Sequence, residues 1–298
     1  SDGEEDEEDD EEGDVAMASE DSNGTLSALC DQLCGPLPPL EFGQLERTSR
    51  MKRALVIKKK KKPLNRINLK TTDFRALFNT GRAGWLNDDV INSVTFLLND
   101  RELRQRSNLN RKVLVMYSWF MEVLADPTRG VSDAQRQTRR AYQGIGPRRG
   151  PSQHDIFKLE RMVVPINIGN SHWTLVLIDF KNKSIHYYDS RRNDTRAAAH
   201  GNKYCSLIRT YLAAEWNRID RGNQQFIDRN WTSTVHQAIT VPQQHNGFDC
   251  GVFVCAFAIV LTHLHLNASD LMSTGISQDR IGSIRGKLAK FIVQEQID

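Results

Sequence analysis

The segment that most limits the possible folds is an uninterrupted apolar run, Val252 to Leu261, which follows a polar, glycine-containing stretch ending in Cys250. This run of ten residues is too short for a membrane-spanning helix, which needs about 20. A helix that is hydrophobic on all sides must be buried within a domain. The chain is therefore expected to build its core around this helix, with Cys250 in the first turn.

The segments on either side of this helix show strand-like and helix-like patterns. Dense Val, Ile and Leu content predicts strands covered on both faces, and apolar residues at helical spacing predict helices. We expect strands at residues 162–168, 173–180, 184–189 and 235–241, and helices at residues 87–98, 204–216, 250–261 and 281–292. The Arg-rich segment 125–153 breaks the apolar pattern and is predicted to be a long surface loop. The fold class is α+β: one domain over residues 63–298, with a central mixed or antiparallel sheet flanked by helices.

The first 62 residues show a strong separation of charge. Residues 1–21 hold 13 acidic residues and no basic one, whereas residues 47–62 hold nine basic residues and no acidic one. Too few periodic apolar residues occur here to offset the entropy of ordering, so residues 1–62 are expected to be mostly disordered. The basic run Met51 to Lys62 is typical of a nuclear-localisation signal, or of a solubilising linker that pairs with the acidic tract. The first interpretation predicts a nuclear protein, with the cytoplasm as a second compartment.

Composition argues against several other classes of protein. An acidic start without an apolar stretch is the opposite of a secretory signal peptide, so a cytosolic or nuclear chain is expected. The five cysteines are irregularly spaced in 298 residues and do not suggest a disulfide framework. Cys30 and Cys34 have no second Cys or His pair near them, which a zinc site would need. Neither a metal nor an organic cofactor is expected.

Cys250 is the first candidate for a catalytic residue. A thiol at a helix N-terminus faces the positive end of the helix dipole and unpaired backbone N–H groups, which favour the thiolate form. Gly251 leaves room for another backbone to approach. The alternative is that Cys250 is a small buried hydrophobic residue, and this interpretation is adopted for Cys255, which lies inside the apolar run.

His172 and Asp189 are the candidates for a base and the group that orients it. His172 stands at the start of one predicted strand and Asp189 at the end of the next. If the two strands form a hairpin, the start of one lies beside the end of the other, so the two side chains would be neighbours. Taken singly, His172 could be a packing residue at a strand end and Asp189 a turn residue.

Four segments of the chain carry a recognisable combination of motifs. They are Trp85-Leu-Asn-Asp-Asp-Val-Ile-Asn92, Val164-Pro-Ile-Asn-Ile168 with His172-Trp173, Tyr188-Asp189-Ser190, and Pro242-Gln-Gln-His-Asn-Gly-Phe-Asp-Cys-Gly251. Together they resemble the SUMO-specific cysteine proteases, a family of papain-like architecture that processes ubiquitin-like proteins. The resemblance spans roughly residues 65 to 298, and the Arg-rich segment 125–153 does not follow the family pattern.

The resemblance implies a role for each residue of the catalytic centre. Cys250 would be the nucleophile, and His172 the general base and acid. Asp189 would orient the imidazole, and the side-chain amide of Gln244 would donate a hydrogen bond to the oxyanion. These roles are chemically consistent, because a cysteine nucleophile needs a base and the base needs an orienting group.

The resemblance also implies three residues that contact the substrate. Trp85 and Trp173 match tryptophans that enclose the C-terminal Gly-Gly of the modifier in a narrow tunnel. Asp88 matches a position that contacts the modifier. The alternatives are core packing for the two tryptophans and a helix cap for Asp88.

The expected activity is that of a thiol protease and isopeptidase in the ubiquitin-like modifier pathway. It would cleave after the C-terminal Gly-Gly of SUMO, maturing precursors and releasing the modifier from target lysines. The partners would be SUMO or another ubiquitin-like protein and its lysine conjugates, with no membrane and no nucleic acid. The enzyme is expected to be a monomer. Residues 63–298 carry 31 basic and 21 acidic residues, a charge of +10, which suits an acidic partner.

Three alternatives keep part of this interpretation. The same triad could act on ubiquitin or another ubiquitin-like modifier. An acyltransferase could use the same scaffold and thioester, although a small acyl donor has no use for a Gly-Gly tunnel. A basic chain could also bind nucleic acid or a modifier without catalysing a reaction.

Overall fold

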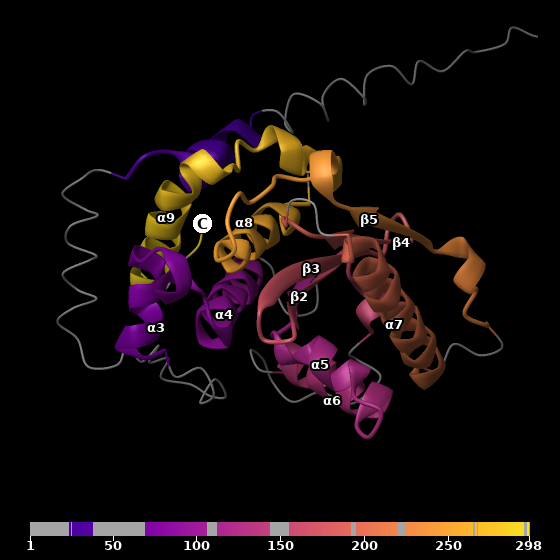
Figure 1. The fold of residues 1–298 in the computed structure, drawn as a ribbon. Helices are drawn as coiled ribbons and strands as arrows, with labels where there is room; N and C mark the ends of the chain where they lie inside the picture. The colour runs from indigo at the N-terminus through magenta and orange to yellow at the C-terminus, as the bar shows by residue number, and fades with distance from the viewer. Residues whose placement is uncertain are drawn as a thin grey trace, which may run out of the picture.

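The structure, a computed structural model, is described for part of the chain. The described residues are 24, 26–37, 69–105, 112–143, 155–191, 195–219, 224–264, 266, 268–294 and 297. A central sheet lies between helices that cover both of its faces (Figure 1). The predicted α+β class with a mixed central sheet and flanking helices is confirmed.

The sheet has five strands that follow one another in chain order. Its outer pairs, β1 with β2 and β4 with β5, are parallel, and the two inner pairs are antiparallel. The strands β3 and β4 form the hairpin considered from the sequence, and β2 pairs with β3 in the same antiparallel manner. Their bounds are β1 (Val113–Val115), β2 (Arg161–Ile168), β3 (His172–Asp179), β4 (Ser184–Tyr188) and β5 (Thr232–His236).

Helices cover the two faces of the sheet as separate groups (Figure 1). One face is covered by α4 (Asp88–Gln105), α8 (Cys250–Leu261) and α9 (Ile281–Gln294), with α3 (Thr71–Arg75) at their edge; the other is covered by α5 (Trp119–Ala125), α6 (Gly130–Gln143) and α7 (Ala197–Arg218). Short 3-10 turns complete the order: η1 (Ala76–Phe78), η2 (Gly81–Gly84), η5 (Ile156–Lys158), η6 (Asp228–Asn230), η7 (Ala238–Thr240), η8 (Ala268–Ser273) and η9 (Gln278–Arg280).

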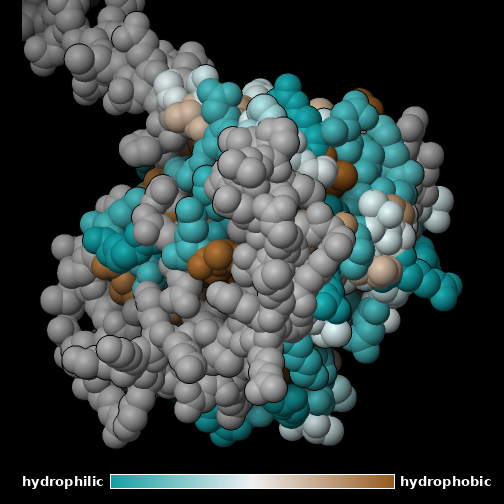
Figure 2. Space-filling model, turned by 90° about the vertical axis from the view of Figure 1, so that its left-hand side faces the viewer, coloured by the Kyte–Doolittle hydropathy of each residue, from teal (hydrophilic) through white to brown (hydrophobic). Residues whose placement is uncertain are grey.

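The strand β3 shows why both faces need helices. Leu175 and Leu177 pack in the cluster that contains α8, whereas Val176 and Ile178 pack in the cluster that contains α7. Successive side chains of a strand point to opposite faces, so an all-apolar strand must be covered twice. Among the coloured residues of the face in Figure 2, hydrophobic residues form only small, separate patches on a mainly hydrophilic surface.

The helix α8 lies at the centre of one of the two clusters. All twelve of its residues are buried, and it contacts β2, β3, α4 and α9. Burial of a side chain such as Phe253 or Phe257 stabilises the fold by about 1.5–3 kcal/mol relative to an exposed side chain. This packing leaves α8 little freedom, and it places the N-terminus of the helix, with Cys250, against the sheet.

The structure corrects the prediction for residues 125–153. This segment was expected to be a surface loop, but it contains the helix α6. The buried side of α6 consists of small residues, Ala134, Thr138 and Ala141, and the Thr138 hydroxyl lies 2.7 Å from the hydroxyl of Tyr211 on α7. Small residues bury little apolar area, and the helical period of α6 is carried mainly by charged side chains on its exposed face, so a search for apolar residues alone did not reveal the helix.

The predicted strand at residues 235–241 is also wrong in its position. The strand β5 covers Thr232–His236, and residues 238–240 form the turn η7. Ala238 has a φ of 52°, in the left-handed region that an extended strand cannot use. The strand β5 lies at the edge of the sheet and its first three residues are exposed, so its Thr-Ser-Thr start shows no apolar alternation.

Part of the N-terminal extension differs from the disorder expected for residues 1–62. Residues 26–34 are helical, and Leu29, Leu33 and Cys34 are buried in the same cluster as α8. The thiol of Cys34 lies 3.6 Å from the Thr274 carbonyl, beyond η8. Leu26 also packs against this cluster, and Leu26, Leu29 and Leu33 are spaced by three and four positions, so one face of a short helix can pack on the domain. The acidic tract and the basic run lie outside the described residues.

Candidate active site

The hairpin of β3 and β4 brings His172 and Asp189 together. His172 is the first residue of β3, and Asp189 follows Tyr188, the last residue of β4. The Nε2 atom of His172 lies 2.7 Å from Oδ1 of Asp189, and the two side chains are 2% and 0% exposed. The backbone N–H of Arg191 donates to the same oxygen at 2.9 Å. The predicted adjacency is confirmed, and the carboxylate holds the imidazole in one orientation.

Cys250 completes this group from the first turn of α8. Asp189 occupies Nε2 of His172, and among the described residues Nδ1 has no hydrogen-bond partner. The buried Cys250 thiol lies close enough to the ring to raise the pKa of His172. Burial alone would lower the pKa of His172, but the hydrogen bond to Asp189 and the interaction with Cys250 outweigh it and raise this pKa to about 9. His172 is therefore protonated at neutral pH, which favours a thiolate–imidazolium pair.

The other cysteine of α8 has a different environment. Cys255 is fully buried within the apolar part of the helix. This burial raises the pKa of the Cys255 thiol to about 12, although Arg285 acts in the opposite direction. A thiol with this pKa stays neutral at physiological pH and is a poor nucleophile. Only Cys250 combines a position at the N-terminus of α8 with a histidine partner.

The glycine after the nucleophile permits close packing around it. A Cβ atom on Gly251 would lie 2.9 Å from Cβ of Leu86 and 3.2 Å from Cδ1 of Trp173. Any larger residue would push these side chains away from the N-terminus of α8. The sequence-based expectation was room for another backbone, whereas the side chains of Leu86 and Trp173 occupy the space beside Gly251.

Gln244 lies in the loop between η7 and α8, where its amide has a fixed orientation. Its backbone N–H donates to the carbonyl of Ser190 at 2.7 Å, and its Oε1 accepts from the Ser190 hydroxyl at 2.9 Å. Its Nε2 then points the other way and donates to the carbonyl of Asn246 at 2.5 Å. The donor group of Gln244 thus faces the loop that leads to Cys250. Its role as an oxyanion donor remains a prediction.

The two candidate tunnel tryptophans have different environments. Trp173 is 4% exposed, belongs to the cluster around α8 and donates from Nε1 to the Leu86 carbonyl at 2.8 Å. Trp85 is 41% exposed and donates to the Gly247 carbonyl at 3.0 Å. Core packing therefore accounts for Trp173 but does not account for Trp85. An exposed indole held against the loop before Cys250 is available to contact a substrate.

Asp88 is exposed and begins α4. The residue that caps this helix is Asn87, whose Oδ1 accepts from the backbone N–H of Val90 at 3.2 Å. Asp88 instead accepts a hydrogen bond from the Ser118 hydroxyl at 2.7 Å, which joins the start of α4 to the residue before α5. The capping alternative for Asp88 is therefore wrong, and its contact with a modifier remains a prediction.

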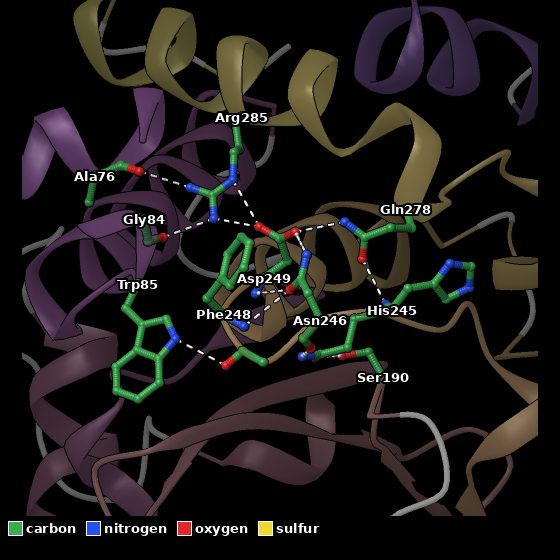
Figure 3. A network of polar contacts seen from close by, with 12 residues as sticks. Ala76, Gly84, Trp85, Ser190, His245, Asn246, Phe248, Asp249, Gln278 and Arg285 are labelled. Carbon is green, nitrogen blue, oxygen red and sulfur yellow. Dashed lines mark hydrogen bonds and ion pairs between the residues drawn. The ribbon is translucent and has the colours of Figure 1, made fainter. Parts of the chain in front are cut away.

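A buried ion pair, which the sequence analysis missed, supports this site from behind. The guanidinium of Arg285, on α9, donates from Nε and Nη2 to Oδ1 of Asp249 at 3.0 and 2.5 Å (Figure 3). Its other donors reach the carbonyls of Ala76 and Gly84, each at 2.8 Å. The residue before the nucleophile is thus joined to the residue before Trp85. One feature of the sequence could have indicated this ion pair: Arg285 stands next to Ile284, which belongs to the apolar stripe of the helix predicted at residues 281–292.

The described part of the chain contains no group of three or more His, Cys, Asp or Glu side chains that could hold a metal ion. Its helices include none that is long and apolar enough to cross a membrane.

A buried cysteine at a helix N-terminus, a histidine beside it and a carboxylate that holds the histidine form the site of a cysteine protease. Comparison with known families agrees with this class. Residues 84–297 match the C-terminal catalytic domain of the Ulp1 protease family, and the chain belongs to this family. The resemblance inferred from the four sequence segments is confirmed.

Curated relatives match a smaller part of the chain. A sentrin-specific protease of Caenorhabditis elegans is 30% identical over 173 residues, which are 58% of this chain and 21% of that protein. Human sentrin-specific protease 2 is 29% identical over 174 residues, 58% of this chain and 25% of that protein. Ubiquitin-like-specific protease 1 of Saccharomyces cerevisiae is 28% identical over 207 residues, which are 69% of this chain and 28% of that protein. The match thus spans about a quarter of each relative's length.

Solved structures show the same fold. The Chaetomium thermophilum Ulp1-like SUMO protease catalytic domain superposes with a TM-score of 0.65 and 23% identity, covering 90% of this chain and 94% of that one. The C-terminal Ulp1 protease domain in complex with Smt3, the yeast ortholog of SUMO, superposes with a TM-score of 0.62 and 22% identity. The superposition covers 88% of this chain and 98% of that one. These similarities support the fold class.

The raised pKa of His172 predicts how activity depends on pH. Asp189 stabilises the protonated imidazole, so the imidazolium persists as pH rises and is lost near pH 9. In Asp189→Ala this stabilisation is removed while burial still lowers the pKa. The alkaline limb of a plot of kcat against pH should therefore move to lower pH, and kcat should fall strongly.

The matched control for this experiment is Glu122→Ala, which removes an equal charge from an exposed position on α5. Its alkaline limb should coincide with that of the wild-type chain. An unchanged limb in Asp189→Ala would contradict the role of Asp189 in holding the imidazolium.

The Asp249–Arg285 pair predicts a large effect on stability. Arg285→Ala would leave the Asp249 carboxylate buried without its cation, which costs about 3–5 kcal/mol. We expect a loss of this size in the free energy of unfolding, measured by urea denaturation. Lys287→Ala removes the same charge from a less buried position on α9, and should cost less than about 0.5 kcal/mol. Equal stability of the two variants would contradict this account.

Proposed function

We propose that this chain is a thiol protease and isopeptidase that cleaves after the C-terminal Gly-Gly of SUMO. The observation that carries the proposal is the buried His172–Asp189 pair beside Cys250 at the N-terminus of α8. This arrangement has the nucleophile, the proton donor and the orienting carboxylate that acyl transfer through a thioester requires. Maturation of precursors and release from lysines are the same reaction on different leaving amines.

The residues support a mechanism in two steps. The Cys250 thiolate attacks the carbonyl carbon of the terminal glycine, and the carbonyl electron pair moves to oxygen. Gln244 Nε2 and the Cys250 backbone N–H stabilise that charge, and loss of one such donor typically costs about a hundredfold or more in rate. As the C–N bond breaks, His172 gives its proton to the departing amine. Water then attacks the thioester with His172 as the base, which releases the carboxylate and the Cys250 thiol.

Two observations support SUMO as the modifier. The solved Ulp1 protease domain that shares this fold is in complex with Smt3, the yeast ortholog of SUMO, and the curated relatives are named as sentrin-specific or ubiquitin-like-specific proteases. Trp85 presents an exposed indole next to the loop that ends at Cys250. A Gly-Gly segment has no side chains, so it can lie in a narrow channel beside such a ring.

The test uses modifiers that carry a thiol-reactive electrophile in place of the C-terminal carboxylate. SUMO, ubiquitin and other ubiquitin-like proteins of this type are each incubated with the wild-type chain, Cys250→Ala and Cys30→Ala. We expect a covalent adduct with SUMO in the wild-type chain and in Cys30→Ala, which removes a partly exposed thiol, and none in Cys250→Ala. Intact-mass spectrometry measures the adduct.

Other outcomes would revise the proposal in defined ways. An adduct only with ubiquitin or another modifier would preserve the mechanism and change the substrate. An adduct that persists in Cys250→Ala would contradict the assignment of the nucleophile. A chain that forms no adduct would favour an acyltransferase or a binding protein on this scaffold.

The basic segment supports a proposal about location. Residues 51–62 contain the run Lys58 to Lys62, and clusters of this kind act as nuclear-localisation signals. We expect a fluorescently tagged chain to concentrate in the nucleus and the variant with these five lysines replaced by Ala to spread into the cytoplasm. An unchanged nuclear fraction would favour the linker interpretation.

A further inference from the structure

Gln278 joins two points of the loop that precedes the nucleophile. It lies on η9, and its side chain points toward this loop (Figure 3). Its Oε1 accepts from the backbone N–H of His245 at 2.8 Å, and its Nε2 donates to Oδ2 of Asp249 at 2.7 Å. A single amide therefore holds the residue after Gln244 and the residue before Cys250 at a fixed separation.

Asn246 closes the same loop from within. Its Nδ2 donates to Oδ2 of Asp249 at 2.6 Å, and its Oδ1 accepts from the backbone N–H groups of Phe248 and Asp249, each at 3.1 Å. Oδ2 of Asp249 is thus shared by Asn246 and Gln278, while Oδ1 is bound by Arg285. Removal of Gln278 alone would leave Asp249 with two of its three side-chain partners.

The oxyanion donor depends on the position of this loop. Gln244 is held by Ser190 through its backbone N–H and its Oε1, and its Nε2 bonds to the carbonyl of Asn246. Ser190 therefore fixes one side of the Gln244 amide, and the loop fixes the other. Gln278 is the residue outside the loop that holds His245, the link between Gln244 and Asn246.

We propose that Gln278 is a positioning residue for the oxyanion donor: its amide fixes the loop 244–249 so that Gln244 Nε2 faces the carbonyl that Cys250 attacks. This proposal rests on the proposed protease function and adds a residue to it. Gln278 lies outside every sequence segment on which the family resemblance was based.

The geometry separates this role from a general structural one. Gln278 is only partly buried, and its loss would remove no apolar side chain from the core. The His172–Asp189 pair has no hydrogen bond to Gln278 or to its loop partners His245 and Asp249. Loss of Gln278 should therefore reduce the steps that need the oxyanion donor and leave formation of the Cys250 thiolate unchanged.

The experiment compares two reactions of the same thiol. Amide cleavage needs both the thiolate and the oxyanion donor, whereas alkylation of Cys250 by iodoacetamide forms no oxyanion and needs only the thiolate. Gln278→Ala removes both hydrogen bonds. Gln278→Glu keeps an acceptor for His245 but cannot donate to Asp249 and places a second carboxylate against it. Asp279→Ala, at the exposed neighbouring position of η9, is the matched control.

In Gln278→Ala we expect kcat for cleavage to fall about tenfold, less than the roughly hundredfold loss when a donor itself is removed. KM and the alkylation rate should stay within about twofold of the wild-type values, because binding and thiolate formation do not use Gln278. In Gln278→Glu the fall in kcat should be larger, and Asp279→Ala should resemble the wild-type chain in all three quantities.

Two results would overturn the proposal. An unchanged kcat in Gln278→Ala would show that the loop keeps its position without this side chain. A parallel fall in alkylation and cleavage would show that Gln278 only maintains the general structure around Cys250. The cleavage substrate is whichever modifier the wild-type chain turns over. If the assignment to SUMO is incorrect, the wild-type chain will cleave a different modifier or none. If the Gln278 proposal is incorrect, the wild-type chain will behave as expected and only the Gln278 variants will deviate.

Discussion

The packing of α8 against β3 is the constraint on which the rest of the site depends. The first residue of α8 is Cys250, and β3 begins with His172, so burying the helix on this strand brings nucleophile and base together. Gly251 permits the close approach, because a side chain there would collide with Leu86 and Trp173. The placement of Cys250 beside His172 is thus a direct consequence of burying an apolar helix.

A second layer of structure holds the polar segment that connects the sheet to α8. Buried backbone and side-chain polar groups must find hydrogen-bond partners, and a loop cannot satisfy them through regular secondary structure. Ser190 hydrogen-bonds to Gln244 on the side of the loop near the sheet, whereas Arg285 and Gln278 hydrogen-bond to Asp249 on the side near the C-terminal helix. The helix at residues 26–34 packs beside Thr274, close to η9 in sequence, so a segment outside the matched family domain also supports this region.

Some of this architecture could be predicted from local patterns. Continuous apolar strands, a tight turn between β3 and β4, and an apolar helix after Cys250 each depend on neighbouring residues, and the hairpin alone places His172 beside Asp189. The errors occurred where packing depends on weak local signals. The buried face of α6 is lined by the small residues Ala134, Thr138 and Ala141, and its helical period is carried by charged side chains on the exposed face. The edge strand β5 begins with exposed polar residues and shows no apolar alternation.

The sequence by itself determined the fold class, the hairpin and the position of Cys250 at the start of a buried helix, because periodicity and chain adjacency encode these features. Only the tertiary structure decided that Arg285 and Gln278 hold Asp249 and that Trp85 is held against Gly247. These contacts join residues 36, 29 and 162 positions apart. No local pattern specifies which distant donor meets a buried carboxylate or carbonyl, since that choice is made only when α9, η9 and the loop before α8 pack together.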